Sequence, residues 1–140
     1  MSEITAAPDV SALEITMDAW TEPFWQAAEQ GLLLLPRCGQ CGHFRWPPGP
    51  FCPRCRSQET EWVAPGPARL YSFTLIRRMM PDNFAQVIAP ALVEFPQAQS
   101  IRIIAAIADA CVDDLKVGSD LVPDWSQAAN GRVPVFRLAN

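Results

Sequence analysis

Lysine and histidine are almost absent from this sequence of 140 residues: Lys116 is the only lysine and His43 the only histidine. A catalytic base of the imidazole type has therefore only one candidate residue. No uninterrupted apolar run reaches the roughly 18 residues that a membrane-spanning helix requires, so no membrane segment is expected. The first residues also lack the basic region and apolar core of a signal peptide. We therefore expect a cytoplasmic protein, because free thiolates persist in that compartment.

Positive charge is missing from the first 29 residues, which carry six acidic residues and no cation. From residue 30 to residue 58 the reverse holds, and this stretch contains no acidic residue but four arginines, Arg37, Arg45, Arg54 and Arg56. Arginine makes forked contacts with carboxylates and phosphates and is common at protein interfaces. These arginines either face a partner or offset the negative charge of a metal–thiolate centre. The net charge of -4 argues against tight binding to nucleic acid.

Four of the five cysteines form two Cys-x-x-Cys pairs, Cys38/Cys41 and Cys52/Cys55, in one short segment rich in proline and glycine. This spacing is typical of tetrahedral metal sites. Four thiolates favour Zn²⁺, with iron in a rubredoxin-type site as the alternative. Two disulfides or a redox-active pair also fit the spacing, but they are less consistent with a protein that has no secretory signal. We therefore predict a zinc ribbon in which these four cysteines are the ligands, with Gly42 in a positive-φ turn.

The sequence predicts a mainly β protein in four segments. Residues 1–17 lack periodicity, and we expect a flexible tail there or an arm laid on a partner. An N-terminal helix and a lead-in strand follow over residues 18–35, and the rubredoxin-like zinc ribbon over residues 36–64. The ribbon is too small to bury much apolar surface, so its order must come largely from the metal. The break at Pro65-Gly66-Pro67 opens the last domain, residues 65–140.

The N-terminal helix is predicted to start at Thr21 as N-cap and to stop at Gly31. The residues on its apolar face are Trp20, Phe24, Ala27 and Ala28. This face either packs on the protein's own body or docks on another subunit, since tryptophan is enriched at the energetic centres of interfaces. The apolar run Leu32–Leu35 then reads as a strand that leads into the first cysteine pair.

The last domain shows the period of β structure. The expected strands cover residues 68–77, 86–95, 100–108, 120–125 and 133–138, and Pro90 should break or bulge the second of them. A short helical turn at Val112–Gly118 follows the third strand, and Asn130-Gly131 is a strong hairpin signal. Five strands with a helical insertion after the third predict a small Greek-key barrel of the OB type.

The order of helix, ribbon and barrel resembles the acyl-CoA-associated zinc-ribbon/OB-fold family known as domain of unknown function thirty-five. The resemblance covers roughly Phe24 to Leu138 and leaves the residues before Ala19 outside. The matching segments are Phe24-Trp25, Leu32 to Cys38, both cysteine pairs with Pro47-Pro48, Tyr71 to Thr74, Val112 to Gly118 and Pro134 to Arg137. One departure is Pro67-Ala68, where members usually have glycine, and it affects only local loop geometry.

The resemblance implies a non-catalytic accessory subunit of thiolase-like enzymes, such as thiolases, acyl-CoA aldolases or ketoacyl-CoA synthases in degradation pathways. The ribbon, with its structural zinc, would dock on the thiolase-fold subunit in a hetero-oligomer. The barrel would help form the channel for the coenzyme A thioester. The resemblance does not select among thiolysis, retro-aldol cleavage and condensation.

A surface that faces coenzyme A should offer arginines to the phosphates. Arg77 and Arg78, at the end of the first barrel strand, are the candidates for CoA binding, although arginines at a strand end are also commonly just solvated. Met79, Met80 and Phe84 are candidates to line an acyl channel or to pack in the core, since methionine adapts to varied apolar shapes.

Nothing in the sequence forms a convincing catalytic set. Cys111, the cysteine outside the two pairs, follows an apolar run and is expected to be buried and inert. His43 lies beside the first pair and is more typical of a surface residue or a support for a metal ligand than of a base. Asp109, Asp113 and Asp114 are better explained by capping and solvation than by acid–base work.

A nucleic-acid-binding module is the main alternative function, because zinc ribbons and OB barrels both occur in that class. Tyr71 and Phe73 alternate with other residues along one strand, and bases could stack on them there. The acidic total and the lack of lysine argue against this alternative. A rubredoxin-like electron carrier would need iron in the ribbon.

Overall fold

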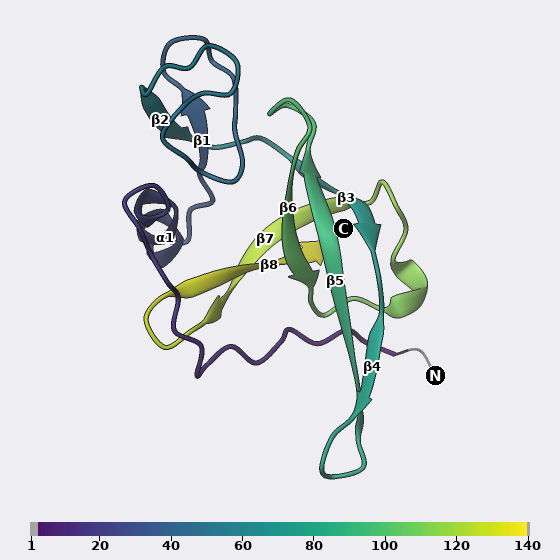
Figure 1. The fold of residues 1–140 in the computed structure, drawn as a ribbon. Helices are drawn as coiled ribbons and strands as arrows, with labels where there is room; N and C mark the ends of the chain where they lie inside the picture. Colours follow the sequence, from purple (N-terminus) through teal and green to yellow (C-terminus); the bar gives the residue numbers. More distant parts are fainter. Residues whose placement is uncertain (1–2, 140) are drawn as a thin grey trace.

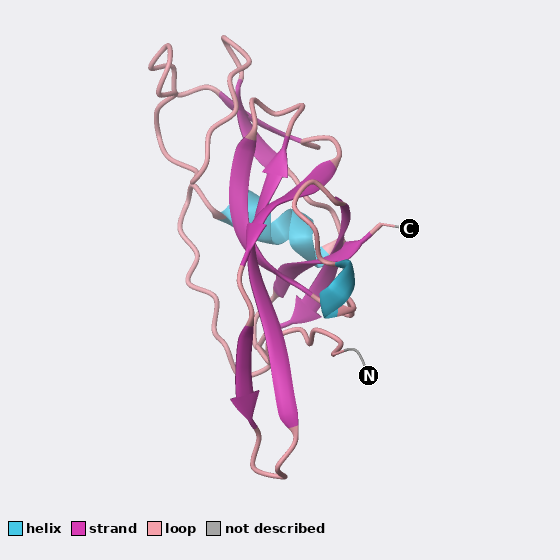
Figure 2. Ribbon diagram, turned by 90° about the vertical axis from the view of Figure 1, so that its right-hand side faces the viewer, coloured by secondary structure: helices cyan, strands magenta, loops and turns pink. Residues whose placement is uncertain are grey.

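The computed structural model describes residues 3–139, and β-strands are the main regular secondary structure (Figures 1 and 2). One α-helix, α1, spans Glu22–Glu29, and a 3-10 helix, η1, spans Val112–Asp114. The strands are β1 (Leu35–Cys38), β2 (Thr60–Val63), β3 (Ala68–Phe73), β4 (Ile76–Met79), β5 (Ala85–Phe95), β6 (Ile101–Ile107), β7 (Asp120–Gln127) and β8 (Arg132–Leu138). Within the described residues, no helix has the length and apolar character to cross a membrane.

Five strands close into a barrel in the order β3-β7-β8-β6-β5, because β5 also pairs with β3. The pairing of β6 with β8 is parallel, and the other pairings in the barrel are antiparallel. The η1 turn lies between β6 and β7, where the sequence predicts a helical insertion. The predicted fold class, an N-terminal helix with a zinc ribbon and a five-stranded OB-type barrel, is confirmed.

One hydrophobic core joins the helix, the ribbon and the barrel. Inside the barrel, the ring centres of Phe95 and Phe136 lie 6.4 Å apart. Phe24 of α1, Leu35 of β1 and Phe44 of the ribbon are buried in the same cluster. Each such side chain contributes about 1.5–3 kcal/mol when it is fully buried. The core therefore holds α1 and the ribbon against the side of the barrel, as Figure 1 shows.

The first predicted barrel strand, residues 68–77, is split in the structure. β3 ends at Phe73 and β4 begins at Ile76, and between them the N–H of Thr74 donates to the carbonyl of Pro90 in β5, at 3.0 Å. Proline has no N–H to donate to a neighbouring strand. β5 itself runs through Pro90 without a break, so the interruption that we predicted for β5 lies in its neighbour instead.

The lead-in strand begins later than predicted. Leu32 is 53% exposed, and only the last residue of the run Leu32–Leu35 belongs to β1, which continues to Cys38. The reason is the turn at Gly31, whose φ of +73° is a left-handed conformation that favours glycine. This turn ends α1 as predicted, but it also separates the leucine run from regular strand geometry.

The start of α1 differs in one respect from the prediction. Thr21 occupies the N-cap position, but its side chain makes no capping hydrogen bond. Instead, Oδ1 of Asp18 accepts from the N–H groups of Trp20 and Thr21, both at 2.9 Å. Trp20 therefore lies in a turn before the helix and is 49% exposed. Our prediction that Trp20 belongs to the apolar face of the helix was wrong.

Residues 3–17, part of the segment 1–17 for which we predicted a flexible tail or an arm laid on a partner, form an extended arm that crosses the barrel; residues 1–2 lie outside the described part (Figure 1). Thr5 is only 1% exposed. Its N–H donates to the carbonyl of Ala110 at 2.8 Å, and its Oγ1 accepts from the N–H of Ala110 at 3.1 Å. The N–H of Ala6 donates to the carbonyl of Val87 on β5 at 2.8 Å.

The other end of the arm is held at the β7–β8 turn. The N–H of Ile15 donates to Oδ1 of Asn130 at 2.7 Å, and Nδ2 of Asn130 donates to the carbonyl of Ile15 at 2.9 Å. These partners are 115 positions apart in the sequence. The arm is ordered by hydrogen bonds to groups that are distant in the sequence, so its own residues show no periodicity.

We predict that Thr5→Val destabilises the protein. Valine preserves the shape of the side chain but removes the acceptor for the buried Ala110 N–H, and an unsatisfied buried donor costs about 1–3 kcal/mol. Urea unfolding measures the free energy, with Thr16→Val on the exposed part of the arm as the matched control. Equal free energies of unfolding for the two variants would contradict an anchoring role for Thr5.

Candidate metal centre and adjoining surfaces

β1 and β2 form an antiparallel hairpin that supports two metal-binding turns at one end of the molecule (Figure 1). In the first turn, the backbone N–H groups of Gln40 and Cys41 point at Sγ of Cys38, each at 3.4 Å. The equivalent groups of the second turn lie 3.4 and 3.5 Å from Sγ of Cys52. Hydrogen bonds of this kind favour the thiolate form, which is the form that binds metal.

Each turn closes through one residue in the left-handed region. The N–H of Gly42 donates to the carbonyl of Cys38 at 3.0 Å, and the φ of Gly42 is +78°, as predicted. In the second turn the N–H of Arg56 donates to the carbonyl of Cys52 at 2.9 Å, with φ at +66°. A non-glycine residue adopts this conformation at a cost of about 1–2 kcal/mol.

The four cysteine sulfurs gather in one cluster, in which the ligand atoms all lie within 4.8 Å of one another. Sγ of Cys38 is 3.5 Å from Sγ of Cys55, and Sγ of Cys41 is 3.6 Å from Sγ of Cys52. Sulfurs at ~2.3 Å from a tetrahedral zinc ion would lie about 3.8 Å apart, so the observed spacing fits. A disulfide needs about 2.05 Å, and all four thiols are free. This geometry matches a metal site rather than disulfides.

The thiol pKa values diverge within the cluster. The N–H of Cys55 is the main cause that lowers the pKa of Cys52 to about 6, against the effect of burial. The pKa of Cys38 is lowered mainly by the N–H of Cys41. For Cys55 the N–H of Ser57 acts in the same direction, but burial and hydrogen bonds with the other thiols outweigh it and raise the pKa to about 12. The cluster therefore needs a cation to keep all four thiols ionised, and a divalent metal supplies it.

Arg45 is a buried cation in the same module, only 6% exposed. Its Nη2 donates to Oγ1 of Thr60, the strand partner of Cys38. Within residues 3–139 its Nε and Nη1 atoms have no hydrogen-bond partner. A buried charge is costly unless another charge compensates it. A zinc ion with four thiolates carries two net negative charges, so Arg45 fits the interpretation that ribbon arginines offset the metal centre.

The outer face of the ribbon has a different character. Arg37 is paired with Glu61 at 2.7 Å, but Arg54 and Arg56 are exposed and have no ion-pair partner in the described chain. Phe51 between the cysteine pairs is 56% exposed. Exposed arginines beside an exposed aromatic ring are typical of a protein interface.

Arg77 and Arg78, the predicted CoA ligands, lie on a hairpin of β4 and β5 that projects from the end of the barrel opposite the ribbon (Figures 1 and 2). Consecutive strand residues point to opposite faces, so the two arginines do not share one site. Arg77 is paired with Glu3 of the arm at 2.8 Å, and this hydrogen bond lowers the pKa of Glu3. Nε of Arg78 donates to Oε1 of Gln86 on β5 at 3.0 Å.

The hairpin tip exposes apolar side chains. Met79 and Phe84 are 68% and 69% exposed, so neither packs in the core. Met80 and Phe84 line a groove of about 470 Å³, whose other wall includes Ile4 and Ala6 of the arm. The sequence identified the hairpin side of this groove but not the arm side, because Glu3 and Arg77 are 74 positions apart.

The residues considered as catalytic candidates make contacts that hold the fold together. Cys111 forms a β-bridge with Ile4 of the arm. Asp109 is paired with Arg137 at 2.9 Å. The carbonyl of His43 accepts from the N–H of Cys38 at 2.8 Å, and its Nδ1 is buried with no partner among residues 3–139.

These features define a class: a zinc-ribbon protein whose ribbon is fixed to an OB-type barrel. A model of the family described as ChsH2, rubredoxin-like zinc ribbon domain, matches residues 25–61. The chain is 34% identical over 119 residues to the probable enoyl-CoA hydratase alpha subunit of Thermomonospora curvata. The match covers 83% of this chain but only 37% of that relative, so the chain spans little more than a third of the relative's length.

Solved structures agree with this class. The structure described as an Ltp2–ChsH2(DUF35) aldolase aligns with a TM-score of 0.77 at 29% identity, covering 91% of this chain and 100% of that chain. A DUF35 protein of Sulfolobus solfataricus aligns over 84% of both chains with a TM-score of 0.60; at 18% identity it supports the fold alone. The zinc-ribbon model and these matches together support the DUF35/ChsH2 family of zinc-ribbon/OB-fold proteins for this chain.

We predict that Cys38→Ser abolishes zinc binding and unfolds the ribbon, because structural zinc contributes on the order of 10–16 kcal/mol to small modules of this kind. The zinc content of the purified protein, measured by elemental analysis, should fall from about one ion per chain to none, and the melting temperature should also fall. Cys111→Ser, the matched control, should keep the metal. Full zinc occupancy in Cys38→Ser, or iron in the native protein, would contradict the assignment.

Proposed function

We propose that this chain is a non-catalytic, zinc-stabilised accessory subunit of a thiolase-fold enzyme complex that acts on acyl-CoA. The observation that carries the proposal is the 29% identity to the Ltp2–ChsH2(DUF35) aldolase chain over 91% of this chain. The name of that structure pairs a DUF35 chain with an aldolase, and the curated relative is named as a subunit of an enoyl-CoA hydratase. Both names describe parts of enzymes, which supports a subunit role for this chain.

We place the docking surface on the ribbon. It projects from the barrel (Figure 1). Its outer face carries the exposed ring of Phe51, together with Arg54 and Arg56, which have no ion-pair partner in the described chain. An aromatic anchor beside arginines favours a partner surface with an apolar pocket and an acidic rim. The zinc ion would act by holding this face rigid, which lowers the conformational cost of binding. The zinc therefore needs no role in the chemistry of the complex.

We place the CoA and acyl contacts on the β4–β5 hairpin. The groove of about 470 Å³ between hairpin and arm is lined by Met80 and Phe84, which suit an apolar chain. Among residues 3–139, the side chain of Arg78 bonds only the neutral amide of Gln86, so its positive charge is available to a phosphate. Arg77 would have to exchange its ion pair with Glu3 before it could contribute.

A nucleic-acid module is less consistent with the barrel surface. The guanidinium of Arg102 lies 3.6 Å from the centre of the Tyr71 ring, so one face of this ring is already covered. Arg102 and Arg69 both approach the buried carboxylate of Glu94, at 3.9 and 3.1 Å. These two arginines share one carboxylate, so their charge is partly compensated within the protein, and the net charge of the chain is -4.

We expect the tagged full chain, captured from its native host, to co-elute with a stoichiometric thiolase-like subunit that survives nuclease treatment. Mass spectrometry identifies the partner. Arg54→Glu with Arg56→Glu should weaken the complex at least tenfold by placing negative charge against an acidic surface, which corresponds to about 1.4 kcal/mol.

Lys116→Glu, an equal charge reversal per site on the far side of the barrel, serves as the control and should leave the complex intact. Zinc content confirms that the ribbon variants are folded. Recovery of only nuclease-sensitive RNA or DNA would support the nucleic-acid alternative instead.

The hairpin assignment leads to a separate prediction for the purified complex. Arg78→Glu should raise KM for the acyl-CoA about tenfold with little change in kcat, because a charge-assisted hydrogen bond to a phosphate contributes about 1.5–3 kcal/mol. A truncated thioester that lacks the CoA phosphates provides the control and should be turned over equally by both proteins. An unchanged KM for the full acyl-CoA would remove Arg78 from the binding surface.

A further inference from the structure

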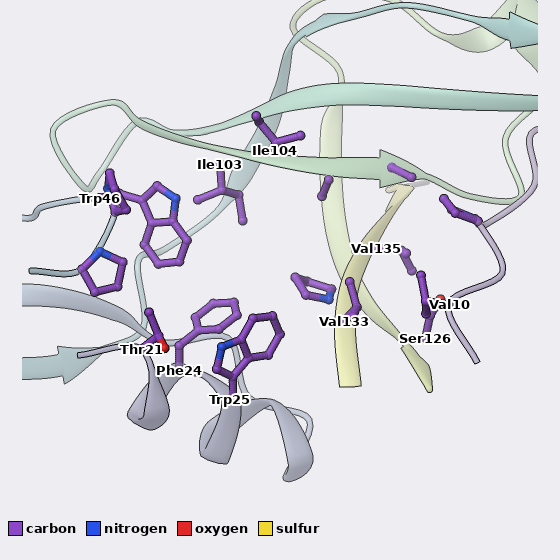
Figure 3. A pocket seen from close by; sticks show the side chains of 16 residues that line it. Val10, Thr21, Phe24, Trp25, Trp46, Ile103, Ile104, Ser126, Val133 and Val135 are labelled. Atoms are coloured by element: carbon purple, nitrogen blue, oxygen red, sulfur yellow. The ribbon is translucent and has the colours of Figure 1, made fainter. Parts of the chain in front are cut away.

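A second concave site lies on the other side of the barrel, between the helix, the ribbon and the arm (Figure 3). Its volume is about 380 Å³, within the range of roughly 300–1,000 Å³ that is usual for small-molecule pockets. In Figure 3, Phe24 and Trp25 of α1 and Trp46 of the ribbon face Ile103 of β6 and Val133 of β8. Residues of the arm, α1, the ribbon, β6, β7 and β8 thus build one pocket, which we call the helix–ribbon pocket.

The lining of the helix–ribbon pocket is mainly apolar and carries no charge. None of the described residues that line it is acidic, basic or histidine, and its polar side-chain groups are the hydroxyls of Thr21 and Ser126 and the indole N–H groups of Trp25 and Trp46. Oγ1 of Thr21 accepts from the N–H of Asp18 at 3.1 Å. The Ser126 hydroxyl makes no hydrogen bond to other residues in the range 3–139. An ionised group would be costly in such a pocket, whereas one neutral oxygen could bond to Ser126.

The aromatic wall is fixed before any ligand arrives. The ring centres of Phe24 and Trp25 lie 4.9 Å apart in an edge-to-face arrangement, and those of Phe24 and Trp46 lie 5.3 Å apart. Phe24 itself is 4% exposed and belongs to the central core. Contacts of this kind hold both indole rings in place. Ligand binding therefore does not have to order these side chains, which lowers its conformational-entropy cost.

The arm closes the remaining side. Pro8 and Val10 line the helix–ribbon pocket, and they lie between the two places where the arm is held, at Thr5 and at Ile15. The stretch between those anchors forms few backbone bonds to the barrel, while the anchors themselves are hydrogen-bonded to it. The arm therefore acts as a strap that forms one wall of the pocket.

We propose that the helix–ribbon pocket is a binding site for an uncharged, largely apolar molecule or moiety with one hydrogen-bonding oxygen. The apolar body would lie between Trp25, Trp46 and Ile103, and the oxygen would accept from the hydroxyl of Ser126. The strap of Pro8 and Val10 would cover the ligand. This site is built from this chain alone, so it does not depend on the enzyme partner proposed above.

The test uses the purified zinc-loaded chain without a partner. The neutral fluorophore Nile red should bind, should quench tryptophan fluorescence by energy transfer, and should be displaced by 1-decanol but much more weakly by decanoate, because the pocket disfavours charge. Val133→Phe, which fills the pocket, should weaken binding at least tenfold. Val122→Phe, the same substitution on an exposed position of β7 outside the pocket, should leave it unchanged. Ser126→Ala should weaken decanol about threefold to tenfold through loss of one hydrogen bond.

A measurement on the unmodified chain keeps the test decisive if Val133→Phe does not fold. With isotope-labelled isoleucine methyl groups, decanol should shift the resonances of Ile103 and Ile104, which line the pocket, and not that of Ile76 on the hairpin. Absence of probe binding, or shifts at Ile76 instead, overturns the proposal. So does a folded Val133→Phe chain that binds probe normally. Loss of the enzyme partner in Val133→Phe, with no decanol binding in the native chain, would assign the pocket to a partner side chain.

Discussion

Four thiols placed within 4.8 Å of one another are the constraint on which the ribbon depends. Backbone N–H groups lower the pKa of Cys52 and favour its thiolate, whereas burial and the neighbouring thiols raise the pKa of Cys55 to about 12. Without a metal, the four cysteines therefore cannot all be thiolates at neutral pH. A divalent cation resolves this conflict. A bound metal would hold both turns in their closed form, including the left-handed conformation of Arg56.

The metal orders the ribbon, but the hydrophobic core decides where the ribbon sits. Phe44 is buried with Phe24 and Leu35, and its N–H bonds Gln99 in the β5–β6 turn. The ribbon and α1 therefore move with the barrel as one body. This rigid junction also brings Trp46 next to Phe24, which creates the concave surface between ribbon and barrel.

The two ends of the molecule offer different surfaces. The ribbon end exposes Phe51, Arg54 and Arg56, whereas the hairpin end carries exposed Met79 and Phe84 with one arginine on each face. The arm connects these regions, because it pairs with Arg77 through Glu3 and passes the helix–ribbon pocket at Pro8 and Val10. This difference supports the proposed roles of the two ends, partner docking at the ribbon and CoA contact at the hairpin.

The sequence by itself determined the local features. Cysteine spacing identified the metal turns, Gly31 and Gly42 marked left-handed positions, and the strand pattern with its helical insertion indicated the barrel. Each of these signals depends on residues that are close in the sequence, since turn geometry and periodicity act over a few positions.

Only the tertiary structure decided what depends on distant partners. The arm gains its order from Ala110 and Asn130, more than 100 positions away, so its own residues carry no signal. The break between β3 and β4 follows from Pro90 in another strand, and the pairing of Arg77 with Glu3 follows from the path of the arm. The helix–ribbon pocket likewise exists only because separate segments share one core. Contacts of this kind are set by the packing of the whole chain, which local pattern does not encode.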